Sequence, residues 1–474
     1  MSLAWANPAL TTVCGLCFRD GDGRKVLRSS VREFLCSEAL AALGIPTTRA
    51  ASIVTSDVSV HRDPLRDGRR VPERCAVVMR VAPSFIRFGS FEIFLQRDEF
   101  SGLEGPSAGR HDLRAQLLDY VIEHFYPETQ HFSDRKQRNA AFFRAVMERT
   151  ARLVAQWQSV GFCHGVLNTD NMSILGLTLD YGPFAFMDRY DPDFVSNSSD
   201  TRGRYSFSSQ PSVCRWNLAR LAEALGSELN PPEAGDILDD FMPTYEALYL
   251  GNMRRKLGLG REEPQDGELI SDLLQLMHNT GADFTNTFRL LSLVPWPEQE
   301  HSQRDPEEDG GTVDSVVEHI LQQCASIEEL KVSNQPTMEQ RELAMILSMA
   351  QSNSAMFSLV SEQPEVSRQL QRMWRLKSSW RRMKTAKGKT TRRLGSLLEA
   401  SVVKKERLKM MKKSNPRVVL RNYICHSAVQ EAERGDFSEV GEMECVRDCD
   451  LFLCLSRYIS NFHDGHKTRY NRSE

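Results

Sequence analysis

The stretch that decides the fold runs from His164 to Tyr181 and reads HGVLNTDNMSILGLTLDY. Apolar residues just before it, over Arg144 to Val160, recur at helical spacing, and Gly161 is expected to end that helix. His164 to Asn171 should therefore form a polar loop held by a rigid element, which is where functional residues tend to lie. The apolar run Met172 to Leu179 then predicts a short buried strand or hairpin.

The polar residues around this hairpin suit a divalent cation bound to a polyphosphate. The hairpin would bring Asp180 back towards Asp170 and Asn171, so that two carboxylates and a carboxamide meet. Protein kinases hold Mg²⁺ with a catalytic-loop Asn and a later Asp-Phe-Gly Asp, while another Asp orients the attacking hydroxyl. The triplet Asp180-Tyr181-Gly182 would be the metal-binding counterpart here.

The adjacency of Asp170 and Asn171 differs from the order in an ordinary kinase, where the base precedes the Asn by several residues. This favours a divergent relative of the kinases. A surface turn rich in Asn, Asp and Thr is the alternative that the loop alone leaves open.

A longer string of motifs decides between these alternatives. After the loop come Gly203-Arg204-Tyr205, Gln210-Pro211 and Trp216-Asn217-Leu218. Matching segments elsewhere are Asp22 to Ser30, Arg32 to Glu38, Gly44 to Arg49, Phe85 to Phe91, Asp283 to Arg289 and Asn415 to Tyr423. Together these motifs, which cover nearly the whole chain apart from its two ends, resemble the selenoprotein O family of kinase-like protein adenylyltransferases.

The resemblance implies an α+β, protein-kinase-like two-lobed fold with a truncated small lobe and a mainly helical large lobe carrying extra C-terminal helices. It also implies transfer of AMP from ATP to Ser, Thr or Tyr hydroxyls of proteins, with Mg²⁺ as cofactor. ATP is flipped in that family relative to a kinase, so that attack falls on the α-phosphorus and pyrophosphate leaves. ATP and protein substrates would be the partners of this chain.

The resemblance assigns roles to individual residues. Asp170 would be the general base, while Asn171 and Asp180 would ligate Mg²⁺. His164 is interpreted as a structural residue of the loop. The remaining nucleotide contacts would be Asp22, Gly23, Glu33, Arg80, Arg87 and Asp180.

Two of these assignments carry further expectations. Glu33 would pair with a small-lobe Lys, and Glu38 on the same predicted helix is the alternative. Arg80 and Arg87 would bind phosphate, because the planar guanidinium matches phosphate oxygens. We expect both arginines to be exposed, so that replacing either should leave stability nearly unchanged.

Two departures from the family pattern stand out. The Gly-rich loop and the Lys expected before Asp22 are missing, with Leu10 close to the position of that Lys, which predicts an N-terminally shortened form. The segment Glu444 to Glu474 contains Cys445, Cys449 and Cys454 but no family-type selenocysteine motif. A catalytically impaired nucleotide-binding or scaffold protein is therefore the main rival, and ordinary phosphotransfer is the rival within enzymes.

Composition bounds the remaining classes. With 474 residues, 41% of them hydrophobic, the chain can bury a large core and favours two or three structural units. No stretch is apolar over enough residues to span a bilayer. The 11 cysteines lack the spacing of a disulfide framework, so we expect buried thiols in a reducing compartment. The lone Cys14-Gly-Leu-Cys17 lacks the second pair that a zinc site needs.

We expect four regions along the chain. Residues 1–96 form a partial small lobe, with a helix over Lys25 to Leu43 and strands around Ile53 and Cys75 to Val81, joined by an exposed loop. Residues 97–297 form the large lobe with the catalytic loop and metal site, 298–312 an acidic flexible linker, and 313–474 a helical C-terminal region.

The basic stretch 367–421 contains Trp374 and Trp380, but its apolar residues recur at helical intervals, so its charges are interpreted as the solvated faces of amphipathic helices. No nucleic-acid partner is expected, because no RNA-binding motif accompanies them. Family resemblance predicts a mitochondrial location. The first residues do not form an Arg- and Ser-rich amphipathic helix, which leaves a cytoplasmic location as the alternative.

Overall fold

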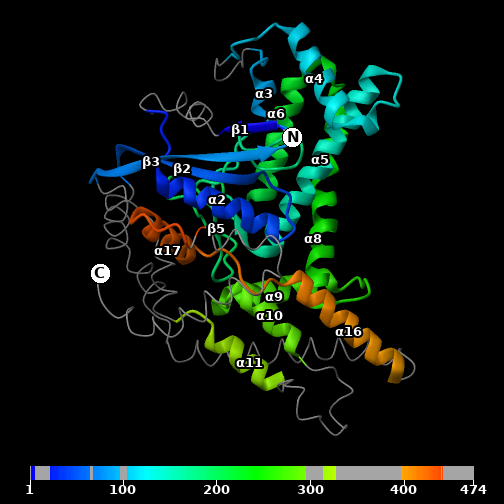
Figure 1. Ribbon diagram of the computed structural model, residues 1–474. Helices are drawn as coiled ribbons and strands as arrows, with labels where there is room; N and C mark the ends of the chain where they lie inside the picture. Colours follow the sequence, from blue (N-terminus) through cyan, green and yellow to red (C-terminus); the bar gives the residue numbers. More distant parts are fainter. Residues whose placement is uncertain are drawn as a thin grey trace, which may run out of the picture. The chain divides into compact units, whose positions relative to one another are not determined.

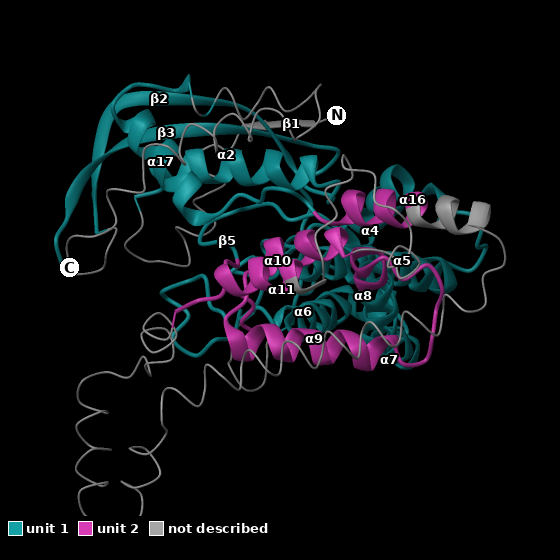
Figure 2. Cartoon of the chain, turned by 90° about the horizontal axis from the view of Figure 1, so that it is seen from below, with its two compact units in different colours: residues 1–186, 193–252, 416–474 teal, residues 187–192, 253–415 magenta. Residues whose placement is uncertain are grey.

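The computed structural model describes residues 2–5, 22–63, 68–96, 104–294, 313–326, 397–438 and 440. The chain divides into two compact units (Figure 2). Unit 1 comprises residues 1–186, 193–252 and 416–474, and unit 2 comprises residues 187–192 and 253–415. Helices and small sheets are mixed, which confirms the α+β class. The predicted small-lobe strands and the helices that follow them fall in one unit, and the lobe boundaries stay predictions.

The sheet of unit 1 is antiparallel, with the strand order β1-β3-β2. Its strands are β1 (Ser2–Trp5), β2 (Arg49–Arg62) and β3 (Val71–Ala82). Helix α2 (Leu27–Ala42) packs against β2 and β3, and α17 (Asn422–Glu433) packs on α2 (Figure 1). The predicted helix and both predicted strands are thus confirmed, because their apolar faces cover one another.

Helices surround the loop from His164 to Asn171 in the same unit. The longest, α5 (Arg135–Val160), starts where the Asp134 side chain accepts a hydrogen bond from the Gln137 backbone N–H. It ends at Gly161, whose φ of 72° lies in the left-handed region. Gly161 therefore ends the helix as predicted. The other elements of this part are α3 (Gly89–Glu92), α4 (His111–Phe125), β4 (Phe162–Cys163), β5 (Ala185–Phe186), α6 (Gln210–Leu225), α7 (Pro231–Asp239) and α8 (Phe241–Leu257).

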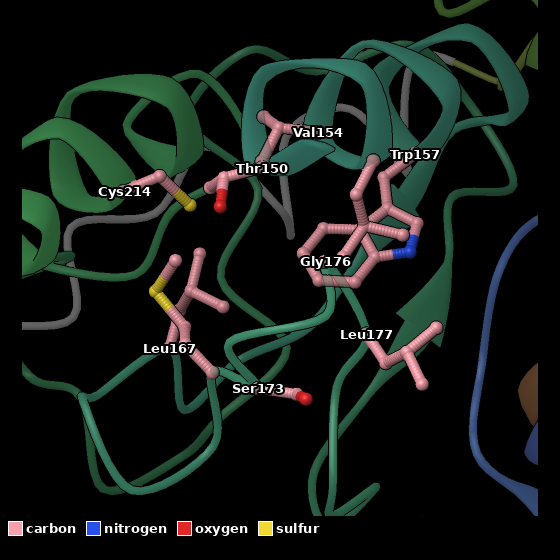
Figure 3. Close-up of a pocket in the computed structure, with 10 residues that line it drawn as sticks. Thr150, Val154, Trp157, Leu167, Ser173, Gly176, Leu177 and Cys214 are labelled. Carbon is pink, nitrogen blue, oxygen red and sulfur yellow. The ribbon is translucent and has the colours of Figure 1, made fainter. Parts of the chain in front are cut away.

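The apolar run after the loop forms the predicted hairpin. Met172 and Thr178 pair in an antiparallel bridge, and Met172 and Ile174 are buried in the main core. Beneath the hairpin lies a small cavity whose walls come from three places, as Figure 3 shows: α5, α6 and the loop–hairpin segment. Its lining includes Thr150, Trp157, Leu167, Ser173, Gly176 and Cys214. The loop and hairpin are therefore seated on the helices rather than projecting from them.

Unit 2 is helical over its described residues. It contains α9 (Asp266–Thr280), α10 (Phe284–Leu290), α11 (Val313–Gln322) and α16 (Leu397–Ser414). The helices α11 and α16 confirm the helical interpretation of those two segments. None of the helices in the described ranges is long and apolar enough to cross a membrane. The predicted linker 298–312, most of the basic stretch and Cys14, Cys17, Cys445, Cys449 and Cys454 lie outside the described residues.

A buried lysine is the most unusual side chain of unit 2. Lys256 is only 2% exposed, and its ammonium lies 4.4 Å from the ring centroid of Phe288. Burial lowers the pKa of Lys256 to about 7. Because the unfolded chain binds more protons than the native chain between pH 7 and the ordinary lysine pKa of 10.5, stability should rise with pH across this interval.

We therefore expect Lys256→Met to raise the melting temperature at pH 6 to 7, by roughly 2–4 °C for each kcal/mol recovered. The advantage over the wild type should shrink as pH rises towards 10, because the native wild-type lysine is neutral above pH 7 and deprotonating the unfolded one costs progressively less as pH approaches 10.5. Thermal unfolding monitored by circular dichroism across this pH range measures the effect. The exposed Lys405→Met in the same unit is the matched control. A gain that does not change with pH would contradict the expectation.

Candidate functional site

The loop from His164 to Asn171 is held by polar side chains of α6. Gln210 accepts a hydrogen bond from the His164 backbone N–H at 2.9 Å and donates through Nε2 at 2.9 Å to the carbonyl of Phe162 in β4, just before the loop. Asn217 donates through Nδ2 to the Leu167 carbonyl at 2.8 Å. Both side chains are buried and belong to motifs that sequence analysis recognised without a role. Their amides fix the loop because buried polar groups need partners.

A second hydrogen-bond chain ties the loop to the hairpin. The Val166 backbone N–H donates to His164 Nδ1 at 3.4 Å, so the ring proton resides on Nε2. That N–H donates to the Thr178 hydroxyl at 2.6 Å, which in turn donates to the Asn171 carbonyl at 2.9 Å. Burial lowers the pKa of His164 to about 4, so the ring is neutral at pH 7. This geometry agrees with a structural role for His164.

Asn171 and Asp180 lie next to each other across the hairpin. The Leu179 backbone N–H donates to the Asn171 carbonyl at 3.2 Å, which brings the residue after Leu179 back beside the loop. Asn171 Nδ2 donates to the Val166 carbonyl at 2.7 Å, and among the described residues its Oδ1 has no hydrogen-bond donor. The Asp180 side chain is 40% exposed. The pair therefore offers an amide oxygen and an accessible carboxylate.

This donor set fits a Mg²⁺ ion bound together with a polyphosphate. Mg²⁺ is usually held by one or two protein oxygens, with water and phosphate oxygens completing its shell. Within the described ranges no group of three or more His, Cys, Asp and Glu side chains gathers to hold a metal by itself. Asn171 and Asp180 are thus the two side chains that could hold such an ion at this site.

Beside the pair lies a buried ionic cluster, which we define as Lys25, Glu33 and Arg80. The Glu33 carboxylate, 3% exposed, forms ion pairs with the Lys25 ammonium and the Arg80 guanidinium. Lys25 Nζ also lies 3.8 Å from Asp180 Oδ1. Arg80 further donates through Nη2 to the Thr48 carbonyl at 3.1 Å. The cluster therefore connects α2 and β3 to the candidate metal ligand Asp180.

The cluster shows which acid on α2 pairs with a lysine, and it overturns the expectation that Arg80 is exposed. Glu33, and not Glu38, is the α2 acid that pairs with a lysine, because Glu38 bonds Arg49 and the Ala50 backbone N–H instead. Arg80 is only 2% exposed, so the expectation of an exposed arginine there is wrong. Its position on β3 faces α2, where a guanidinium must be paired to be buried.

Lys25 was not among the predicted site residues. The family pattern predicts the pairing lysine before Asp22, whereas in the structure the ammonium of Lys25, just ahead of α2, forms the ion pair with Glu33. Lys25 lies outside the helix that carries Glu33, so no periodicity signals their contact. Residues 6–21, the segment in which the family pattern would place the Gly-rich loop and the lysine, lie outside the described residues.

Asp22 and Gly23 lie at a different point from the cluster. Asp22 bonds Arg62 at the end of β2, with Nη2 to Oδ1 at 2.6 Å, and this hydrogen bond lowers the pKa of Asp22 to about 2. Arg62 Nη1 also donates to Asp22 Oδ2 at 2.8 Å, and the Arg24 backbone N–H donates to Asp22 Oδ1 at 3.0 Å. Gly23 has a φ of 69°, which favours glycine. The structure thus joins neither residue directly to Asn171 or Asp180.

Arg87 lies beside the candidate base. Its Nη1 donates to the Asp170 carbonyl at 3.3 Å, and its backbone pairs with Ser173 in an antiparallel bridge. Arg87 is half-buried and Asp170 is partly exposed. Two of the predicted residues from distant parts of the sequence are therefore brought together at the loop.

Comparisons with known proteins agree on one family. The family model described as protein adenylyltransferase SelO matches residues 17–446. The protein named "Protein adenylyltransferase SelO-1, mitochondrial" from Danio rerio is 57% identical over 442 residues, covering 89% of this chain and 63% of that protein. The SelO proteins of Homo sapiens and Mus musculus, with the same type of name, are 52% and 49% identical, each over 89% of this chain and 65% of that protein. The chain thus spans slightly less than two thirds of these relatives.

The two arginines should differ in their contribution to stability. Arg80→Ala leaves Glu33 with Lys25 alone, and breaking a buried pair costs about 3 kcal/mol or more. Arg87→Ala, the matched variant, removes one half-buried guanidinium and should cost less than about 1 kcal/mol. Thermal melts of both variants against the wild type measure this difference. Equal melting temperatures for the two variants would show that the cluster does not stabilise unit 1.

Acid should weaken the loop through His164. The pKa of His164 is about 4 in the native chain and 6.5 ordinarily, so the unfolded chain binds more protons between these values. Native stability is therefore lost as pH falls from about 6.5 to 4. His164→Gln keeps a donor for Thr178 without titrating, so its melting temperature should fall less on acidification than that of the wild type. The exposed His319→Gln is the control and should follow the wild type.

Proposed function

This chain belongs to the protein adenylyltransferase SelO family, and we propose that it transfers AMP from ATP to Ser, Thr or Tyr hydroxyls of proteins. The relatives carry this activity in their names. The single observation that carries the proposal to this chain is the meeting of Asn171 and Asp180 across the hairpin, with Lys25 3.8 Å from Asp180. We also propose the kinase-like two-lobed arrangement that the family implies.

Asn171 and Asp180 hold Mg²⁺ in this proposal. The ion, when bound, neutralises charge on the phosphate oxygens. Asn171 contributes Oδ1, because its Nδ2 is engaged with the loop carbonyl of Val166. Asp180 contributes its accessible carboxylate. The Lys25 ammonium lies between this carboxylate and that of the buried Glu33. The hairpin bridge between Met172 and Thr178 sets the separation of the two ligands.

Fixed cations bind the phosphates of ATP. Lys25 lies between Glu33 and Asp180, so its ammonium is positioned where a phosphate oxygen would approach the metal ligand. Arg87 lies at the Asp170 end of the loop, and no carboxylate in the described part of the chain forms an ion pair with it that would compete with phosphate. Arg80, which is 2% exposed, acts through its ion pair with Glu33. Asp22 and Gly23 remain proposed nucleotide contacts on the segment that leads to Lys25.

Asp170 is the proposed general base. The protein hydroxyl oxygen forms a bond to the α-phosphorus while the bond to pyrophosphate breaks, and the hydroxyl proton passes to the Asp170 carboxylate. Arg87 fixes the backbone of Asp170 through its carbonyl, which keeps the carboxylate at the loop. Because such transfer depends on position and charge neutralisation, small displacements of these groups are costly.

The curated relatives are named as mitochondrial proteins, and we propose the same location for this chain. Protein substrates and ATP are its proposed partners. The rival functions, ordinary phosphotransfer and a non-catalytic scaffold, are kept as outcomes of the experiment below because no contact in the described residues favours either of them.

Labelled ATP distinguishes the three functions. We expect label from α-³²P-ATP, and none from γ-³²P-ATP, on protein incubated with the chain and Mg²⁺. Asp180→Ala, Asn171→Ala or chelation of the metal should reduce α-label incorporation by about 100-fold or more, because charge neutralisation is lost. Asp112→Ala, which removes a carboxylate exposed on α4, is the control. Incorporation of γ-label would mean phosphotransfer, and no label at all would favour the scaffold.

A further inference from the structure

A short segment ahead of α4 is hydrogen-bonded to the loop and to the hairpin, through its backbone and through the Arg87 side chain. The segment runs from Ile86 to Glu92 and includes the single turn of α3. Three of the hydrogen bonds join backbones: Ile174 N–H to the Ile86 carbonyl at 3.2 Å, Phe88 N–H to the Met172 carbonyl at 2.9 Å, and Gly89 N–H to the Thr169 carbonyl at 3.2 Å. The fourth runs from the side chain of Arg87, whose Nη1 donates to the Asp170 carbonyl at 3.3 Å. The backbones on both sides of Asp170 are thereby fixed to this segment.

Gly89 lies directly against the Asp170 carboxylate. A Cβ atom built on Gly89 would overlap Asp170 Oδ1 and lie 3.2 Å from its Cγ and 3.7 Å from its Cα. The backbone angles of Gly89 are not left-handed, so conformation alone does not require glycine there. The requirement comes from the space that the Asp170 carboxylate occupies.

We propose that Gly89 is a positioning residue for Asp170, because the absence of a side chain at Gly89 leaves the carboxylate its place beside the loop. This inference rests on the proposed function, in which that carboxylate accepts the hydroxyl proton. The hydrogen bonds of Thr169 and Met172 hold the two backbones together, so the backbone cannot separate to admit a methyl group. The strain must therefore be relieved by rotating the Asp170 side chain away from its position.

Gly89→Ala should then impair the chemical step and spare nucleotide binding. A displaced base loses the contribution of general base catalysis, about 100-fold or more in kcat. The KM for ATP should change less than about threefold, since Asn171, Asp180 and Lys25 do not contact Gly89. The matched control is Gly235→Ala on α7, outside the proposed site, because a Cβ there meets no atom within 4 Å. Gly235→Ala should keep kcat close to that of the wild type.

A double-variant cycle with Asp170→Ala separates positioning from a general structural role. Removing the Asp170 carboxylate removes both of the closest atoms and leaves the Cα at 3.7 Å, an ordinary contact distance. Gly89→Ala should therefore cause no further loss of kcat in the Asp170→Ala background. It should also raise the melting temperature there, because alanine restricts the unfolded chain more than glycine does. In the wild-type background the clash should cancel that rise.

The outcomes distinguish the two proposals. If Asp170→Ala keeps full activity, the proposed base is wrong. The melting temperatures of the two single variants and the double variant still show whether a side chain at Gly89 clashes with the Asp170 carboxylate. If Asp170→Ala is inactive but Gly89→Ala keeps the kcat of the wild type, Gly89 does not position the base. If Gly89→Ala fails to fold, recovery of folding in the double variant supports the steric contact, and failure to recover overturns it. If the chain transfers no label, the melting temperatures of the same variants still test the steric contact between Gly89 and Asp170.

Discussion

The interaction on which the site of unit 1 depends is the sharing of one buried carboxylate between two cations. Glu33 is almost inaccessible to water, so its charge is tolerated only because Lys25 and Arg80 pair with it. These three residues come from α2, from β3 and from the segment before α2. Because Lys25 also approaches Asp180, the same pairing fixes the distance between the sheet and the hairpin that carries the candidate metal ligand. Loss of either cation would leave Glu33 with a single partner, and loss of Glu33 would leave the buried Arg80 guanidinium without its ion pair.

The loop from His164 to Asn171 is positioned mainly by neutral groups, with the Arg87 guanidinium as a charged donor to the Asp170 carbonyl. Gln210 and Asn217 on α6 bond its backbone, and the neutral His164 ring passes a hydrogen-bond chain through Thr178 to Asn171. Neutral donors suit this place because they orient the loop without adding charge beside Asn171 and Asp180, the side chains that could hold the metal. The loop thus combines a fixed backbone with side chains, those of Asp170 and Asp180, that remain accessible.

Local patterns predicted the elements that carry the site. The apolar spacing of α5 and the glycine after it gave the correct helix end, since Gly161 adopts the left-handed conformation that ends helices. The apolar run with a polar residue at each end gave the hairpin that returns Asp180 to Asn171. The placement of Glu33 on α2 also followed from helical spacing. What failed was the environment of side chains: Arg80 was expected in solvent, and the lysine partner of Glu33 was sought in the wrong segment.

The sequence by itself determined the helices α2 and α5, the strands β2 and β3, the hairpin and the membership of a family, because each depends on residues close together in the chain or on a long string of motifs. The tertiary structure alone decided which charges meet and which atoms share a space. Lys25 and Asp180 are distant in sequence, and so are Gly89 and Asp170. Such contacts are set by the packing of α2, β3 and α3 on the loop, and no periodicity in the sequence reports a distance between residues on different elements.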